Sequence, residues 1–201
     1  MTIRPSPVLG EGHRRTWLYP IMALYVAFLG SIASHGERLL MEDLRRALWR
    51  EDFDDVETVV AEDNILFRHE ERPTQGLSEK LAYILLDRFE IDNVAPVRSR
   101  EELLAAIAEN PFTERFGPEG ARTMFLAQQP FPEQFELLES QFGGRGPELV
   151  APGTRALHCA YPEGSKGTPL TADFIERRLG CRGTMRRIGD LQRIADKMDE
   201  N

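Results

Sequence analysis

Apolar and polar residues alternate along the chain in segments that have the lengths of short strands and helices. Residues 21–29, IMALYVAFL, form an apolar run that stops at Gly30, which is typical of a buried strand. Residues 41–49, MEDLRRALW, place Leu44 and Leu48 on one helical face with charges opposite. The pattern therefore predicts a strand followed by an amphipathic helix that packs on it.

The next segments predict a hairpin, a helix and a strand. Residues 56–61 and 65–68 have strand character, and the polar residues 62–64 between them suit a tight turn. Residues 76–89 place apolar side chains at helical spacing. Residues 94–98 predict a short strand, which its proline confines to the edge of a sheet.

A capping box predicts the start of a helix in the middle of the chain. The Ser99 hydroxyl can accept from the Glu102 amide while the Glu102 side chain reaches back, which predicts a helix from Ser99 to Asn110 that Pro111 stops. The segments beyond it again predict short strands and helices. They are a strand at 123–127, a helix at 133–140, a hairpin of 148–151 and 156–161 across Pro152-Gly153-Thr154, a helix at 170–179 capped by Thr168 and Pro169 and ended by Gly180, a strand at 184–187 and a helix at 191–198.

Each half of the chain has the element order strand, helix, strand, strand, helix, strand. This order is that of the ferredoxin-like split βαββαβ unit, in which two helices cover one face of a four-stranded antiparallel sheet. The expected fold is therefore α+β, with two tandem ferredoxin-like subdomains joined by a connecting helix. The expected organisation is a mobile extension at 1–19, the first subdomain at 20–98, the connecting helix and loop at 99–120, and the second subdomain with a C-terminal helix at 121–201.

The stretch from Thr16 to Gly36 carries no Asp, Glu, Lys or Arg and imitates a secretory signal peptide, with Arg14 and Arg15 before it. Its apolar run at 21–29 is short for a membrane helix, which needs ~20 apolar residues. Removing the stretch would also take the first strand out of the repeated unit. We therefore expect a cytoplasmic protein without a membrane segment.

Composition narrows the classes of partner and cofactor. The formal net charge of -8 argues against nonspecific attraction to nucleic acid or anionic lipid. The two cysteines, Cys159 and Cys181, are too few for a disulfide framework and have no zinc-ligand spacing. No metal, cofactor or catalytic constellation is expected.

Short motifs spread along the chain are similar to those of a bacterial family, the domain-of-unknown-function family numbered sixteen ninety-seven. The resembling residues are Met41 and Leu44, Asn64 with Phe67, Arg98-Ser99 with Glu102-Leu103, Asn110-Pro111-Phe112, Tyr161-Pro162 with Gly164, and Glu176 with Leu179-Gly180. The resemblance covers Ile21 to Met198 and implies two ferredoxin-like subdomains and no established activity.

The chain departs from this family in its polar loops. The family's Arg and Asn in the first loop are replaced by Leu29 and Ile32, and of its hairpin motif only Asn64 remains. A family Ser-Lys pair stands here as Thr168-Pro169, with Lys166 displaced. If these polar residues form the family's ligand site, that function is lost or changed in this chain.

The loop from Gly30 to Gly36 is a candidate anion site. Its backbone amides and hydroxyls can face an anion, with His35 as a titratable partner and Arg38 as a positive charge. The alternative is an ordinary surface loop with a solvated histidine. The basic C-terminal segment from Arg177 to Lys197 likewise offers phosphate binding, but salt bridges to the chain's own carboxylates are the simpler interpretation.

Two hypotheses of function follow. The first is a noncatalytic binding or interaction module, whose open sheet edges support a homodimer. The second is a binder of a small anionic ligand such as a phosphate, or an enzyme, that uses the cleft between the subdomains. The candidate residues for that cleft are Ser34, His35, Arg38, Asn64, Lys166 and Arg186.

Overall fold

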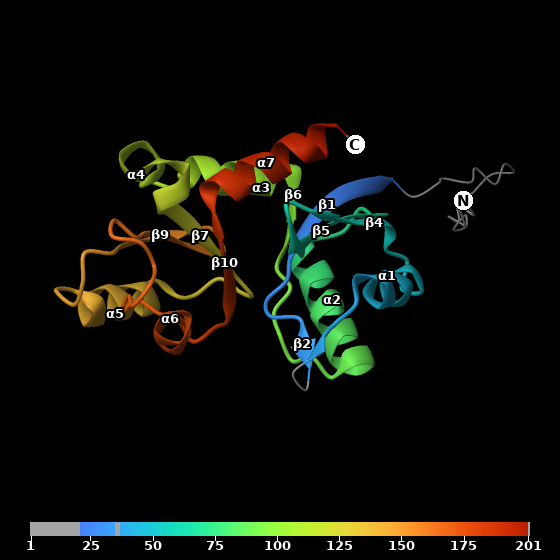
Figure 1. Ribbon diagram of the computed structural model, residues 1–201, viewed down its shortest axis with the longest axis horizontal. Coiled ribbons are helices and arrows are strands. Elements are labelled where there is room, and N and C mark those ends of the chain that lie inside the picture. Colours follow the sequence, from blue (N-terminus) through green and yellow to red (C-terminus); the bar gives the residue numbers. More distant parts are fainter. Residues whose placement is uncertain (1–20, 35–36, 201) are drawn as a thin grey trace, which may run out of the picture.

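The computed structural model describes residues 21–34 and 37–200, and the predicted N-terminal extension lies outside them. The first subdomain is a four-stranded antiparallel sheet in the order β4-β5-β1-β6. Its strands are β1 (Met22–Phe28), β4 (Asp54–Val59), β5 (Ala61–Glu70) and β6 (Val97–Ser99). The helices α1 (Met41–Trp49) and α2 (Thr74–Phe89) cover one face of this sheet (Figure 1).

The second subdomain repeats this arrangement. Its sheet has the order β10-β7-β9-β8, and α5 (Pro132–Phe142) and α6 (Ala172–Leu179) cover one face. The strands are β7 (Ala121–Leu126), β8 (Leu149–Gly153), β9 (Ala156–Ala160) and β10 (Gly183–Arg187). In both sheets the first and third strands are central and the second and fourth are at the edges, so the predicted pair of ferredoxin-like units is confirmed.

The other faces of the two sheets meet in a shared core. The helices α3 (Arg100–Glu109) and α7 (Ile188–Asp199) lie side by side across both subdomains in Figure 1 and contribute Leu103 and Leu191 to this core. Phe28 of β1 stacks on Phe125 of β7 with ring centroids 4.3 Å apart and 7° between the planes. The hydrophobic contact between the subdomains is thus a buried core, which opposes relative movement.

Local sequence signals set several boundaries as predicted. The capping box of Ser99 and Glu102 is present at the start of α3, with the Glu102 amide donating to the Ser99 hydroxyl over 3.3 Å. Gly180 ends α6 in the left-handed conformation (φ 64°), which glycine adopts without steric cost.

The first hairpin turns at a different place from the one predicted. The chain reverses at Val60, which has a left-handed φ of 61°, and residues 62–64 belong to β5. Asn64 pairs with Phe28 of β1 and is buried, so pairing to the central strand overrides the turn preference of its polar neighbours. The loop after β1 also contains an unpredicted small hairpin of β2 (Ala33–Ser34) and β3 (Glu37–Arg38).

Two further predictions in the second half are wrong in detail, and one helix lies where none was expected. Pro152 lies in the edge strand β8, not in the turn, because the missing N–H is tolerated at a sheet edge. The N-cap of α6 is Thr171, whose side chain accepts from the Phe174 amide, and not Thr168. The helix α4 (Thr113–Gly120) was not predicted, because Gly117 and Pro118 interrupt its pattern.

Within the described residues, no helix is both long enough and apolar enough to cross a membrane.

Candidate functional site

A cleft of about 500 Å³ lies between the two subdomains. The first subdomain contributes the loop after β1, Arg38, Asp63 and Asn93 to its walls. The second contributes Ala172, the first residue of α6, and residues 183–185 of β10. The cleft therefore lies where the ends of β1 and β5 approach β10.

Close packing fixes the walls of this cleft. Asn93 donates from Nδ2 to the Ser31 carbonyl over 2.7 Å and accepts at Oδ1 from the Val94 amide over 2.8 Å. A Cβ added to Gly30 would lie 2.2 Å from Asn93 Oδ1, and one added to Gly183 would lie 2.7 Å from the Phe125 carbonyl oxygen. Glycine at these two positions lets the backbone pack this closely.

Arg186 of β10 crosses from the second subdomain to the first beside this cleft. Its guanidinium donates to Asn64 Oδ1 over 2.6 Å, to the Leu29 carbonyl over 2.8 Å and to the Asp63 carbonyl over 3.0 Å. An Asp63 carboxylate oxygen lies 3.0 Å from Nη2. Burial lowers the pKa of Arg186, while Asp63 opposes that shift. Arg186 therefore joins the subdomains at a point where an unpaired charge would be costly.

A second group of arginine contacts joins the subdomains near α3. Arg98 donates to the Arg155 carbonyl over 2.7 Å, and Arg155 donates to Thr74 Oγ1 over 2.9 Å and lies 3.4 Å from Glu102. Burial, with the nearby Arg155 charge, lowers the pKa of Arg98 to about 9. The contacts of Arg186 and those of Arg98 and Arg155 thus join the subdomains in addition to the shared apolar core.

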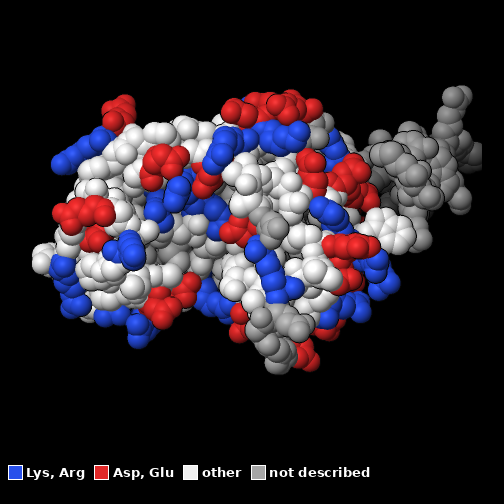
Figure 2. Space-filling view, in the orientation of Figure 1, with Lys and Arg blue, Asp and Glu red and all other residues white. Residues whose placement is uncertain are grey.

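From Arg182 onward, the cations of the basic C-terminal segment form internal salt bridges, as expected. Arg182 lies 2.8 Å from Asp92, and Arg187 lies 3.0 Å from Glu119. Figure 2 shows the same mixing on a larger scale, because positive and negative side chains alternate over the visible face. This face therefore has no broad field of one sign that would attract a polyanion.

The structure brings three of the six candidate residues to the cleft region. Asn64 and Arg186 are bonded to one another and buried, and Arg38 lines the cleft. Ser34 lies in β2, but its side chain is outside the described part, as is the whole of His35.

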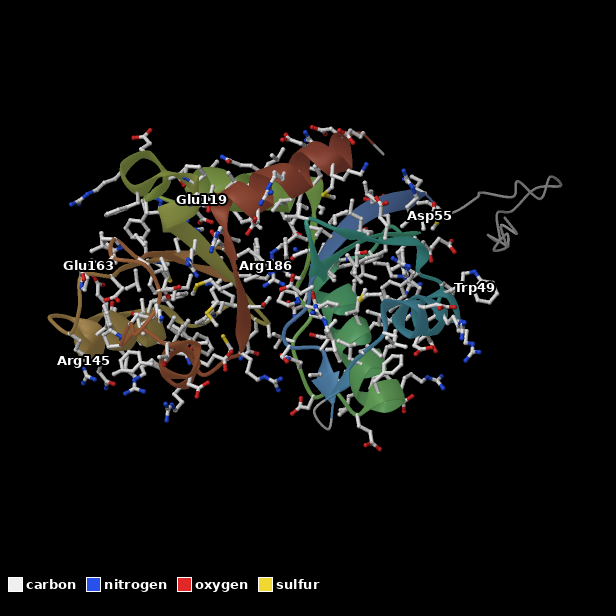
Figure 3. All side chains as sticks on the ribbon, in the orientation of Figure 1. Trp49, Asp55, Glu119, Arg145, Glu163 and Arg186 are labelled. Carbon is white, nitrogen blue, oxygen red and sulfur yellow. The ribbon has the colours of Figure 1, made fainter. Side chains whose placement is uncertain are left out.

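Lys166 is exposed in the loop between β9 and α6 and does not line the cleft. Glu163 of the same loop lies at the outer end of the second subdomain, away from the central Arg186 (Figure 3). The structure therefore does not bring Lys166 to the other candidate residues.

Three polar residues of this region were not singled out from the sequence. The sequence pattern places Asp63 in a turn and Thr184 in a strand, and Asn93 follows α2 in an irregular segment. Thr184 Oγ1 donates to the Leu29 carbonyl over 3.3 Å and accepts from Arg186 over 2.7 Å. The Asp-Asn pair at 92–93 is a typical turn signal that marks Asn93 as a candidate for bonding to local backbone.

Neither the Thr184 hydroxyl nor the two described thiols is a free nucleophile in the cleft. The Thr184 hydroxyl is engaged as above, and both cysteines are buried elsewhere in the second subdomain. Burial raises the pKa of Cys159 to about 12 and raises that of Cys181, so both thiols stay protonated and weakly nucleophilic. Across residues 21–34 and 37–200, no three His, Cys, Asp or Glu side chains gather as a metal site would require.

Comparison with known proteins shows a similar solved structure and a matching family model. The chain is similar in structure to the conserved bacterial protein SP0830 from Streptococcus pneumoniae, with 16% identity, a TM-score of 0.63, and coverage of 89% of this chain and 99% of that one. At this identity the likeness shows the fold alone. No curated protein matches the sequence. The family model described as "Protein of unknown function (DUF1697)" matches residues 22–158, more than half of the chain. The chain therefore belongs to the DUF1697 family.

Proposed function

We propose that this protein is a noncatalytic binding module that holds a small anionic ligand in the cleft between its subdomains. The observation that carries the proposal is the cleft itself, with walls from both subdomains and Arg38 among its lining residues. Its volume of about 500 Å³ is within the range of ordinary small-molecule sites.

The charges around the cleft favour an anion. Arg38 is exposed and lies in the lining of the cleft. Ala172 is the first residue of α6, and the backbone N–H groups of a helix N-terminus carry a partial positive charge, part of which Asp173 in the same turn offsets. The negative charge of Asp63 is balanced by its ion pair with Arg186.

The fixed geometry of the cleft favours binding without a large conformational cost. Arg186, Thr184 and Asn93 hold the surrounding backbone through buried or interlocked hydrogen bonds. A preorganised site loses less conformational entropy when the ligand binds.

A thermal-shift screen with phosphate, pyrophosphate, citrate and nucleoside monophosphates tests the proposal. A ligand present at 100 times its Kd stabilises the folded state by about 2.7 kcal/mol, which raises the Tm of a chain of this size by roughly 5–10 °C. Arg38→Gln should abolish most of that shift. Arg50→Gln, an exposed arginine beyond the end of α1 that does not line the cleft, should keep it.

Isothermal titration calorimetry with the anion that raises the Tm most then measures its Kd for the natural chain and for both arginine variants. A panel in which no anion raises the Tm, or an equal rise in Tm in both arginine variants, would contradict the proposal. A shift that depends on Arg38 but falls smoothly with salt supports a site where charge contributes much of the affinity.

A further inference from the structure

A second cavity, of about 450 Å³, lies between α5 and the edge strand β8. Pro132, Phe135 and Leu138 of α5 form one wall, Val150 of β8 forms the other, and Leu157 of β9 completes the lining. We call this cavity the α5–β8 pocket. It belongs to the second subdomain alone and is separate from the cleft.

Large apolar side chains remain exposed beside the pocket. Phe131, between the lining residues Pro130 and Pro132, is 74% exposed, and Leu137 is 43% exposed. An apolar cavity next to such side chains is typical of a surface that binds another chain.

The rim of the pocket is acidic. Glu136 and Glu139 line it, and Glu133 is exposed one turn earlier on α5. Among the residues that the structure describes, no Lys or Arg forms an ion pair with Glu136 or Glu139. A partner that fills the pocket with an apolar side chain and places cations beside it would match both features.

The chain itself contains a segment of that chemistry. Residues 14–19, Arg-Arg-Thr-Trp-Leu-Tyr, join two arginines to three large apolar side chains and precede β1. Trp and Arg are also the residue types that contribute most at protein interfaces. We propose that the α5–β8 pocket binds residues 14–19 of a second copy of this chain, with Trp17 in the pocket and the two arginines beside Glu136 and Glu139.

The partner must be a second copy because the segment of the same molecule is too short. Trp17 is four residues before Ile21 and extends roughly 14 Å from it at most. The start of β1 and the helix α5 lie at opposite ends of the molecule (Figure 1), and a folded chain of this length has a diameter of roughly 40 Å. Reciprocal exchange of the two segments would form a closed dimer.

Analytical ultracentrifugation of the full chain at several concentrations is the first test. The proposal expects a concentration-dependent dimer whose Kd rises with salt, because charged groups contribute to it. Trp17→Ala should weaken the dimer about tenfold or more. Circular dichroism of the same variant separates loss of contact from loss of folding.

Charge reversal tests the position of the segment. Glu136→Lys with Glu139→Lys should weaken the dimer, whereas Glu163→Lys, an exposed glutamate outside the pocket, should not. Adding Arg14→Glu and Arg15→Glu to the rim double variant should restore much of the affinity, because the opposite charges then face each other again.

A labelled peptide of residues 12–20 provides an independent measurement by fluorescence anisotropy with the full chain. Binding that the rim double variant weakens supports the proposal. A chain that stays monomeric at every concentration and fails to bind the peptide would overturn it, as would a dimer whose affinity Trp17→Ala leaves unchanged.

Discussion

Arg186 and Arg187 are neighbours in β10 but lie in opposite environments. Arg186 is buried and bonded to the first subdomain, whereas Arg187 is half exposed and pairs with Glu119. Arg186→Met should lower the free energy of unfolding by about 3–5 kcal/mol, because it leaves Asp63 without its cation and buried acceptors without a donor. Urea denaturation measures the loss.

The matched control is Arg187→Met, which should cost about 1 kcal/mol or less, since exposed ion pairs contribute little. An equal decrease in the free energy of unfolding in the two variants would mean that the contacts of Arg186 with the first subdomain contribute no more than an exposed ion pair.

His158 makes the stability depend on pH. Burial lowers its pKa from the ordinary value of 6.5, although Glu109, 3.6 Å from Nε2, opposes the shift. The folded state therefore binds fewer protons than the unfolded state near and below pH 6.5, and the free energy of unfolding falls as pH falls through this range. The pKa of His69 is also lowered, mainly by burial, and acts in the same direction.

Urea midpoints from pH 7.5 to pH 5.5 should therefore decrease. His158→Gln should have a smaller decrease than the natural chain, because only His69 then contributes this buried-histidine effect. An unchanged slope would show that His158 takes up its proton equally in both states.

At the scale of single elements, the capping box at the start of α3 is expected to contribute to the stability of the protein. Ser99 and Glu102 exchange side-chain and backbone hydrogen bonds there, and Glu102 also accepts from Thr74 of α2 over 2.9 Å. Ser99→Ala should destabilise the protein by about 1 kcal/mol, as the loss of an N-cap typically does. Thermal unfolding followed by circular dichroism measures it, with Ser140→Ala, an exposed serine of α5, as the control.

Elements with strong local signals were predictable, and those that depend on distant partners were not. The helix at 41–49 and the cap at Ser99 follow from residues a few positions apart. The hairpin turn was misplaced because Val60, a β-branched residue, adopts a left-handed φ that its own chemistry disfavours. Pairing of β1 along its whole length with residues 64–70 of β5 compensates for that cost, and this pairing cannot be read from the hairpin alone.

At the scale of the whole molecule, the repeated element order predicted the two sheets but not the way they meet. The bond between Asn64 and Arg186 joins residues 122 positions apart, and no local sequence pattern indicates that the two side chains bond to each other. The cleft was expected between the subdomains, and Arg38 lines it. The roles of Asp63 and Thr184 depend on tertiary packing, which leaves no local pattern.

Because the two sheets share one core, we expect the two subdomains to unfold together. Phe125 lies in this core with Phe28 and helices α3 and α7, so its loss should weaken both sheets. Phe125→Ala should cost about 3–5 kcal/mol. Hydrogen exchange should accelerate in peptides from β5 and β9 alike, because both are exposed in one cooperative transition.

Phe131→Ala is the control, because its ring is 74% exposed and outside this core. Exchange in both peptides should stay near that of the natural chain. Faster exchange in β9 with full protection in β5 after Phe125→Ala would show two units that unfold independently. The stacked pair and the buried Arg186 argue against that result, since opening either sheet alone would leave apolar surface and a charged group without their partners.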